Sequence, residues 1–218
     1  MPPTPPSPRL IKGGLVLLNP DGSGNPRVIA FQYNPDTLTR TLQAQTAGAD
    51  NQDGRVEPLR FKAPPVESIK FDAEIDATDA LANGDDTATQ LGILPQLSAL
   101  ESLVYPSTDQ LRQTNSLSGS GTLEIAPVLA PVCLFVWSDK RIVPVKVTDF
   151  SITEEAFDPN LHPIRAKVSL GLRVLTVADI GFNTRAGSLY LEYQRQKEQA
   201  AAQVSSVGLE ALGLHGLP

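Results

Sequence analysis

The stretch "ESIKFDAEIDAT", residues 67–78, decides the fold, because its apolar and charged residues alternate with a period of two. Such alternation is typical of a strand with one face in the core and the other face outside. The sequence therefore predicts a half-buried strand with an acidic outer face. Its inner face holds Ile69, Phe71, Ala73, Ile75 and Ala77, and its outer face holds Lys70, Asp72, Glu74 and Asp76.

A second alternating stretch, "PIRAKVSLGLRVLT" at residues 163–176, places basic residues on its polar face. Opposite charges on two outward faces can set the register and the choice of a partner. The charge pattern is explained equally well by solubility alone. On the first interpretation the predicted subunit or partner contacts are Asp72, Glu74, Asp76, Arg165, Lys167 and Arg173.

Further strand-like runs fill most of the chain. "LVLLN" and "RVIAFQY" flank the turn-rich "PDGSGNP" and predict a hairpin, and strands are also expected at 38–44, 123–125, 132–137 and 142–158. A tight hairpin is expected at "WSDKRIVP". Many strands around one helix, without βαβ alternation, favour a mainly β fold, an antiparallel barrel or sandwich.

One core helix is predicted between Thr87 and Tyr105, where leucines recur every three or four residues. Pro95 lacks an N–H group and suits a first turn that begins near Ile93. The segments 45–65 and 107–121 show no periodicity, and we expect two long loops there that reach a neighbouring subunit.

The chain divides into three predicted parts. Residues 1–14 are proline-rich and expected to be disordered, 15–180 form the β domain, and 181–218 form a helical or flexible tail. The tail has one narrow apolar stripe at Leu189 and Tyr193, which we expect to dock on an adjacent subunit or partner protein. Its removal is expected to cost the core little stability.

Charge and composition restrict the class of partner. The net charge of −6 and the pI of about 4.9 exclude a general phosphate-binding surface, so no nucleic acid partner is expected. No signal peptide and no apolar run long enough for a membrane span is visible. Together with a single cysteine, Cys133, this favours folding in a reducing cytosol.

Candidate catalytic residues are scarce. His162 and His215 fall in loop-like segments without a second ligand at metal spacing, and Cys133 lies in an apolar run typical of a buried core thiol. The glycine-rich "SGSG" at 118–121 lacks the Lys-Ser/Thr pair of a phosphate-binding loop. We therefore expect no catalytic, metal or cofactor site.

An Asn-Pro-Asp sequence interrupts the strand-like residues at "FQYNPDTL", 31–38. Pro35 suits the second position of a β-turn, and Asn34 is expected to hydrogen-bond the turn backbone. Phe31, Tyr33 and Leu38 are expected to pack together around this corner.

The same segment resembles the F-x-F-N-P-x-T-L segment of tube and hub proteins of contractile injection systems. "GILPQLSALESLVYP" at 92–106 and "DPNLHPIRAKVSLGLRVLT" at 158–176 are similar to that family's helix and closing strand. Within that family, the chain resembles the baseplate hub adaptor, or tube initiator, rather than the repeated tube subunit. Such adaptors usually continue into a LysM domain, but no Y-x-V-x-x-G-D-T-L segment follows here.

The resemblance implies a tail-tube type of β fold that assembles into a homohexameric ring. Its implied partners are the inner tube protein, a trimeric VgrG-like spike protein and other baseplate proteins, within a particle assembled in the cytoplasm. It implies neither catalysis nor a cofactor. Two alternatives remain open: a stacking subunit of the inner tube and, in a different class, a small-ligand-binding or hydrolytic β-barrel.

Overall fold

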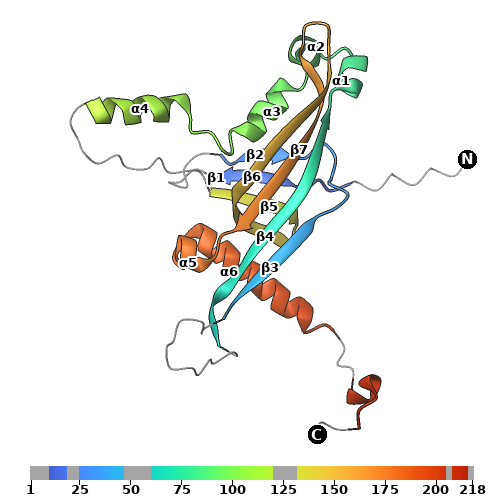
Figure 1. Cartoon of the computed structure of the whole chain (residues 1–218), viewed down its shortest axis with the longest axis vertical. Helices are drawn as coiled ribbons and strands as arrows, with labels where there is room; N and C mark the ends of the chain where they lie inside the picture. The colour runs from blue at the N-terminus through green and yellow to red at the C-terminus, as the bar shows by residue number, and fades with distance from the viewer. Residues whose placement is uncertain (1–9, 19–24, 47–59, 120–131, 205–207, 216–218) are drawn as a thin grey trace, which may run out of the picture.

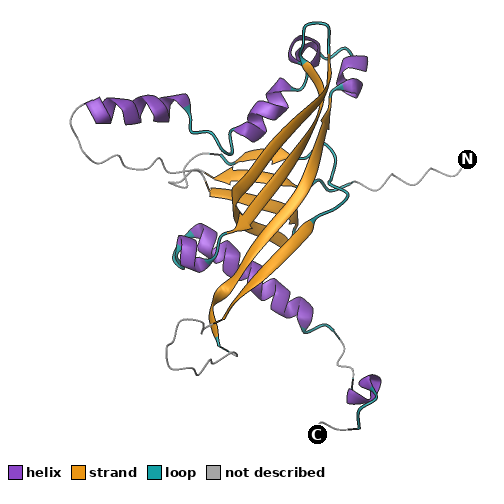
Figure 2. Ribbon diagram, in the orientation of Figure 1, coloured by secondary structure: helices purple, strands orange, loops and turns teal. Residues whose placement is uncertain are grey.

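The computed structural model describes residues 10–18, 25–46, 60–119, 132–204 and 208–215. Their strands form one antiparallel sheet in the order β2-β1-β5-β6-β7-β4-β3, which confirms the mainly β class (Figures 1 and 2). The strands are β1 (Gly14–Leu18), β2 (Arg27–Ala30), β3 (Thr39–Thr46), β4 (Phe61–Asp76), β5 (Val132–Ser138), β6 (Arg141–Phe157) and β7 (Pro163–Val174).

Helices lie toward both ends of the sheet. Figure 1 shows α1 and α2 at one end of the long axis and α6 in the opposite half of the molecule, where it packs against β6. The helices are α1 (Thr78–Ala82), α2 (Asp86–Leu91), α3 (Leu94–Glu101), α4 (Thr108–Gly119), α5 (Val177–Ile180) and α6 (Arg185–Ala201), followed by the 3₁₀ helix η1 (Leu209–Leu212).

The two alternating stretches form strands, as predicted, and they lie next to each other in the sheet. β4 and β7 are antiparallel neighbours, with Ile69 opposite Leu172 and Ala73 opposite Val168. All four side chains are buried, and the predicted inner faces of both strands form the main hydrophobic core. The predicted hairpins β1–β2 and β5–β6 are also confirmed. The strand expected at 123–125 lies outside the described residues.

The prediction of one helix between Thr87 and Tyr105 is wrong, because the segment breaks at Gly92 into two helices, α2 and α3. Gly92 has a φ of 58°, and a Cβ there would lie 2.1 Å from the carbonyl oxygen of Pro163. The next amide, of Ile93, donates to that same oxygen at 2.8 Å. This contact ties the α2–α3 junction to the start of β7, and Pro95 lies in the first turn of α3 as expected.

The loop expected at 107–121 is instead helical, because α4 occupies Thr108–Gly119. Ser107 and Gln110 form a reciprocal cap: the Gln110 amide donates to the Ser107 hydroxyl at 3.2 Å, and the Ser107 amide donates to the Gln110 side chain at 2.9 Å. This Ser-x-x-Gln pattern is a helix-start signal, which the apparent lack of periodicity concealed.

The other expected loop, 45–65, is shorter than predicted. Gln45 and Thr46 belong to β3, and Phe61 to Pro65 belong to β4. The register runs from Thr39 opposite Lys70 to Thr46 opposite Phe61, with irregular pairing toward the end. Of the predicted loop, residues 47–59 lie outside the described part of the chain.

The ends of the sheet are brought together by a side chain at the Asn-Pro-Asp corner. The Gln32 amide donates to the Asp76 carbonyl at 2.7 Å and accepts from the Asp76 N–H at 3.0 Å, as a neighbouring strand would. Phe31, just after β2, packs edge-on against Phe71 of β4 with ring centroids 5.2 Å apart. A link between the end of β2 and β4 therefore curls the sheet toward a barrel.

Asn34 performs a different task from the one predicted. Its side chain accepts from the Gly13 N–H at 2.8 Å and donates to the Ile11 carbonyl at 2.9 Å, so it fastens the segment before β1 rather than its own turn. Phe31 is buried and Leu38 packs partly against the core, but Tyr33 is half-exposed. The predicted three-residue corner is wrong in its Tyr33 member.

Candidate assembly surfaces

The charged residues predicted on β4 and β7 lie side by side within the chain. The register sets Asp76 opposite Arg165 and Glu74 opposite Lys167. Arg165 Nε lies 2.8 Å from Asp76 Oδ2, and Lys167 Nζ lies 2.9 Å from Asp72 Oδ2. These charges thus face each other across two strands of one chain, and their predicted contact with another subunit stays a prediction.

The hydrogen bonds of this charged face keep its groups ionised. Hydrogen bonds from Ser169 and Lys167 lower the pKa of Asp72, and hydrogen bonds from Thr78 and Arg165 lower the pKa of Asp76. In turn, Asp72 raises the pKa of Lys167, and Asp76 raises the pKa of Arg165. Since these pairs are solvent-exposed, they contribute little stability.

Arg173, the remaining predicted contact on β7, turns toward the chain's own α5. Its Nη2 lies 2.7 Å from Asp179 Oδ1. Asp179 also closes a capping box with Thr176 at the start of α5. Burial raises the pKa of Asp179, but the bonds from Thr176 and Arg173 outweigh it and lower the pKa overall. Arg173 therefore holds the connection between β7 and α5.

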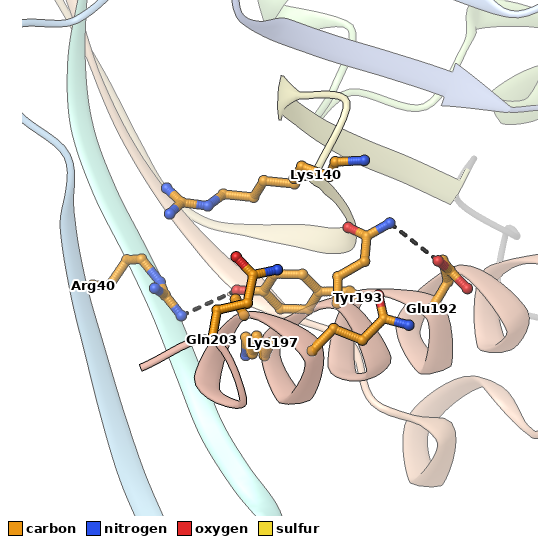
Figure 3. A pocket seen from close by; sticks show the side chains of 10 residues that line it. Arg40, Lys140, Glu192, Tyr193, Lys197 and Gln203 are labelled. Atoms are coloured by element: carbon orange, nitrogen blue, oxygen red, sulfur yellow. Dashed lines mark hydrogen bonds between the residues drawn. The ribbon is translucent and has the colours of Figure 1, made fainter. Parts of the chain in front are cut away.

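A groove of about 450 Å³ lies between α6, β3 and the β5–β6 hairpin. We call it the basic groove, because its charged lining consists of Arg40, Lys140, Arg141 and Lys197 against a single carboxylate, Glu192. Figure 3 shows Lys140 on the hairpin side and Arg40 on the β3 side, with α6 along the groove. This is a concentrated positive surface on a chain whose net charge is −6.

Glu67 of β4 lies behind the basic groove and is 3% exposed. Arg40 binds its Oε1 through Nη2 at 2.6 Å, and Lys197 binds its Oε2 at 3.1 Å. Burial raises the pKa of Glu67, but Arg40 and Lys197 outweigh burial and hold the pKa below its usual value. One carboxylate balances only one of these two cations, so the groove retains positive charge.

Tyr193 of α6 completes this cluster. Its hydroxyl donates to Glu67 Oε1 at 3.0 Å and accepts from Arg40 Nη2 at 3.0 Å, while Lys197 Nζ lies 3.9 Å from the ring centroid. Burial, reinforced by the Glu67 charge, raises the pKa of the Tyr193 hydroxyl. The ring itself belongs to the chain's own core.

The tail therefore has a role in the core that its sequence pattern did not predict. Tyr190 and Tyr193 are both buried in the main cluster, so the expectation that removal of everything after Gly181 leaves the core intact is wrong for α6. The side chain of Tyr193 is used within the chain. Leu189 is half-buried, and its contact with another protein stays a prediction.

A signal for Glu67 was present in the sequence. Glu67 continues the odd-numbered inner face of "ESIKFDAEIDAT", where an unpaired carboxylate would be costly. A cation facing it could have been inferred. The identity of that cation could not, because Arg40 and Lys197 come from elements 27 and 130 residues away.

The remaining candidate residues are a buried thiol, a histidine in a turn and an exposed histidine. Burial raises the pKa of the Cys133 thiol to about 12. His162 Nδ1 lies 2.9 Å from Asp158 Oδ2 in the turn between β6 and β7, and His215 is exposed. Within the described ranges, no group of three or more His, Cys, Asp or Glu side chains could hold a metal ion, and no helix is long and apolar enough to cross a membrane.

Comparison with known proteins finds one family. A model of the family described as "Contractile injection system tube protein" matches residues 17–177, which include nearly all of the sheet. No curated protein matches the chain. Two solved structures are similar over 74% of this chain and 90% of theirs: the tail of an empty GTA particle with C6 symmetry, at 17% identity and a TM-score of 0.27, and the virion of a native gene transfer agent particle, at 15% and 0.26. Because both TM-scores are this low, these similarities support no further statement about the present chain.

Proposed function

The chain belongs to the contractile injection system tube protein family, and on this premise we propose that it is a structural subunit that assembles into a closed ring of the tube. The family match over residues 17–177 is the observation that carries this proposal. The matched region includes the Gln32 side chain that bonds to the Asp76 backbone, the corner at Asn34, and the paired strands β4 and β7. The ring is the functional unit, and it acts by shape rather than by catalysis.

The sheet has the free strand edges that such assembly needs. β2 and β3 are the end strands of the described sheet, so each has one edge without a strand partner. Exposed edges bind further strands readily. A neighbouring copy that covers these edges would extend the sheet around a ring, and we propose six copies in a homohexamer.

At the finer level, we propose that this ring is the tube initiator, an adaptor between the inner tube and a trimeric VgrG-like spike in a particle assembled in the cytoplasm. The segments "FQYNPDTL", 92–106 and 158–176 support this assignment, because they resemble, in the same order, segments of the family's tube and hub proteins. Other baseplate proteins would surround the ring. The charged face of β4 and β7 and the half-buried Leu189 are candidate contacts for these partners.

A stacking subunit of the inner tube is the second candidate. It is favoured by the position of the basic groove in one half of the molecule and of the carboxylates of α1 and α2 at the opposite end (Figure 1). Electron microscopy of the purified chain separates the two roles. An initiator forms single rings that bind a co-expressed spike protein, whereas a stacking subunit grows into tubes without any partner.

A further inference from the structure

We infer that the basic groove of one copy receives the acidic α1–α2 end of a second copy, so that copies associate head to tail. This inference rests on the second candidate function, the stacking subunit, and names the contact that would join one copy to the next. It is carried by the charge of two surfaces at opposite ends of one chain. The charge of neither surface is fully neutralised by described residues of the same chain.

The first surface is the acidic end. Residues 78–91, which include α1 and α2, contain no Lys or Arg and carry three carboxylates, Asp79, Asp85 and Asp86. Asp79 and Asp86 are exposed in the first turns of α1 and α2, and within the described residues neither forms an ion pair. Asp85 caps α2 by accepting from the Ala88 amide at 2.8 Å. The end therefore presents free negative charge.

The second surface is the basic groove. Its two inner cations, Arg40 and Lys197, share the single carboxylate of Glu67. Arg141 forms no ion pair with any described residue, and Lys140 pairs only with its exposed neighbour Asp139 at 3.4 Å. The lining carboxylate, Glu192, is bound by Arg195 at 2.6 Å. The groove thus keeps uncompensated positive charge beside a hollow that can admit side chains.

The position of the two surfaces decides the kind of contact. The long axis of the chain is vertical in Figure 1, with α1 and α2 at its upper end and α6 in the lower half. One copy cannot bring its own acidic end to its own groove. A contact between unlike surfaces of two copies is not self-complementary, so it continues from copy to copy and is not satisfied in a twofold dimer.

Opposite charges of this kind accelerate encounter and exclude wrong orientations. A reversed copy would bring groove to groove or acid to acid, and both arrangements are repulsive. The contact therefore gives the assembly a direction, as a tube that joins a spike at one end requires. Because the charges are exposed, association should weaken as the salt concentration rises.

The test is a charge exchange in the full-length chain. Lys140→Glu with Arg141→Glu reverses the charge of the groove rim and leaves the hydrogen bonds to Glu67 in place, and Asp79→Lys with Asp86→Lys reverses the acidic end. Arg185→Glu, at the far end of α6, and Glu210→Lys, on η1, are matched controls that change charge elsewhere. Light scattering and electron microscopy measure assembly, and circular dichroism confirms folding of each variant.

Each reversed pair is expected to raise the protein concentration needed for end-to-end association at least about tenfold, whereas the controls assemble like the unaltered chain. An equimolar mixture of the two reversed proteins should restore association, because the two kinds of copy can alternate and every contact then joins opposite charges. A single chain that carries both reversals should also restore association, since it again presents opposite charges at its two ends.

Three outcomes overturn the inference. Reversed variants that associate at the same concentration as the unaltered chain show that the groove does not hold the acidic end. Rings that never associate end to end also reject the head-to-tail contact, and they leave the proposed ring function intact. An unaltered chain that stays monomeric at every concentration and salt level rejects both proposals together.

Discussion

The hydroxyl of Tyr193 donates a hydrogen bond to the carboxylate of Glu67 at 3.0 Å, and this contact joins α6 to strand β4. The two residues are 126 positions apart in sequence. Arg40 from β3 binds both groups, so three distant segments meet at one buried carboxylate. The floor of the basic groove is therefore part of what holds the fold together, while its rim is free to bind.

Replacement of Glu67 by Gln is expected to lower the free energy of unfolding by about 1–3 kcal/mol. The change leaves Arg40 and Lys197 without their carboxylate, but both are partly exposed and can regain water, which keeps the loss below that of a fully buried pair. Urea denaturation measures the difference. Glu74→Gln, on the exposed face, serves as control and should shift stability by less than about 0.5 kcal/mol. Equal effects of the two variants would contradict the structural role of Glu67.

The same carboxylate predicts how stability depends on pH. The pKa of Glu67 in the folded chain lies below its ordinary value of 4.5. A carboxyl with a depressed pKa contributes stability that is present above its unfolded pKa and is lost as the pH falls through its folded pKa. The stability difference between the unaltered chain and Glu67→Gln should therefore be largest near neutral pH and shrink steadily below pH 4.5. Denaturation curves from neutral to acidic pH test this, and a difference that is constant or grows on acidification would refute it.

Truncation after Gly181 is expected to destabilise the β domain severely. It removes Tyr190 and Tyr193, which are buried in the main core, and the melting temperature should fall by about 10 °C or more. A stop at position 205 is the matched control. It retains α6 and removes the described residues 208–215, which are exposed, so it should melt close to the full-length chain. Equal melting temperatures for both truncations would show that α6 is not part of the core.

Gln32→Leu is expected to lower stability by about 1–2 kcal/mol. The substitution removes both hydrogen bonds between the Gln32 side chain and the backbone of Asp76, which link the corner after β2 to β4. Gln90→Leu places the same change at an exposed position on α2 and is the control. Hydrogen exchange provides a second readout, because the Asp76 amide should lose protection in the first variant only. Unchanged protection at Asp76 would show that Gln32 does not close the sheet.

Much of the sheet could be predicted from period-two patterns alone. Ile69 to Ala77 and Ala166 to Val174 alternate cleanly because each strand is buried on one face only, and the structure places the predicted faces inward. β3 was predicted from the same signal, but Leu42 is half-exposed. The sheet extends beyond its core at that end, and no local pattern records where the core stops.

The remaining differences come from contacts between distant segments. The break at Gly92 depends on the carbonyl of Pro163, which belongs to another hairpin. The tail was predicted to be peripheral because its apolar stripe is narrow. In the structure, Tyr190 and Tyr193 of α6 nevertheless pack into the main core. The basic groove could not be predicted, since its cations come from β3, the β5–β6 hairpin and α6.

Native mass spectrometry of the full-length chain tests the central claim most directly, because a ring has a fixed number of subunits. The account predicts a closed species at six times the chain mass of 23.3 kDa, seen as sixfold rings in electron microscopy of the same sample, alone or after co-expression with tube and spike proteins. A chain that remains at the mass of one subunit under all these conditions would contradict it.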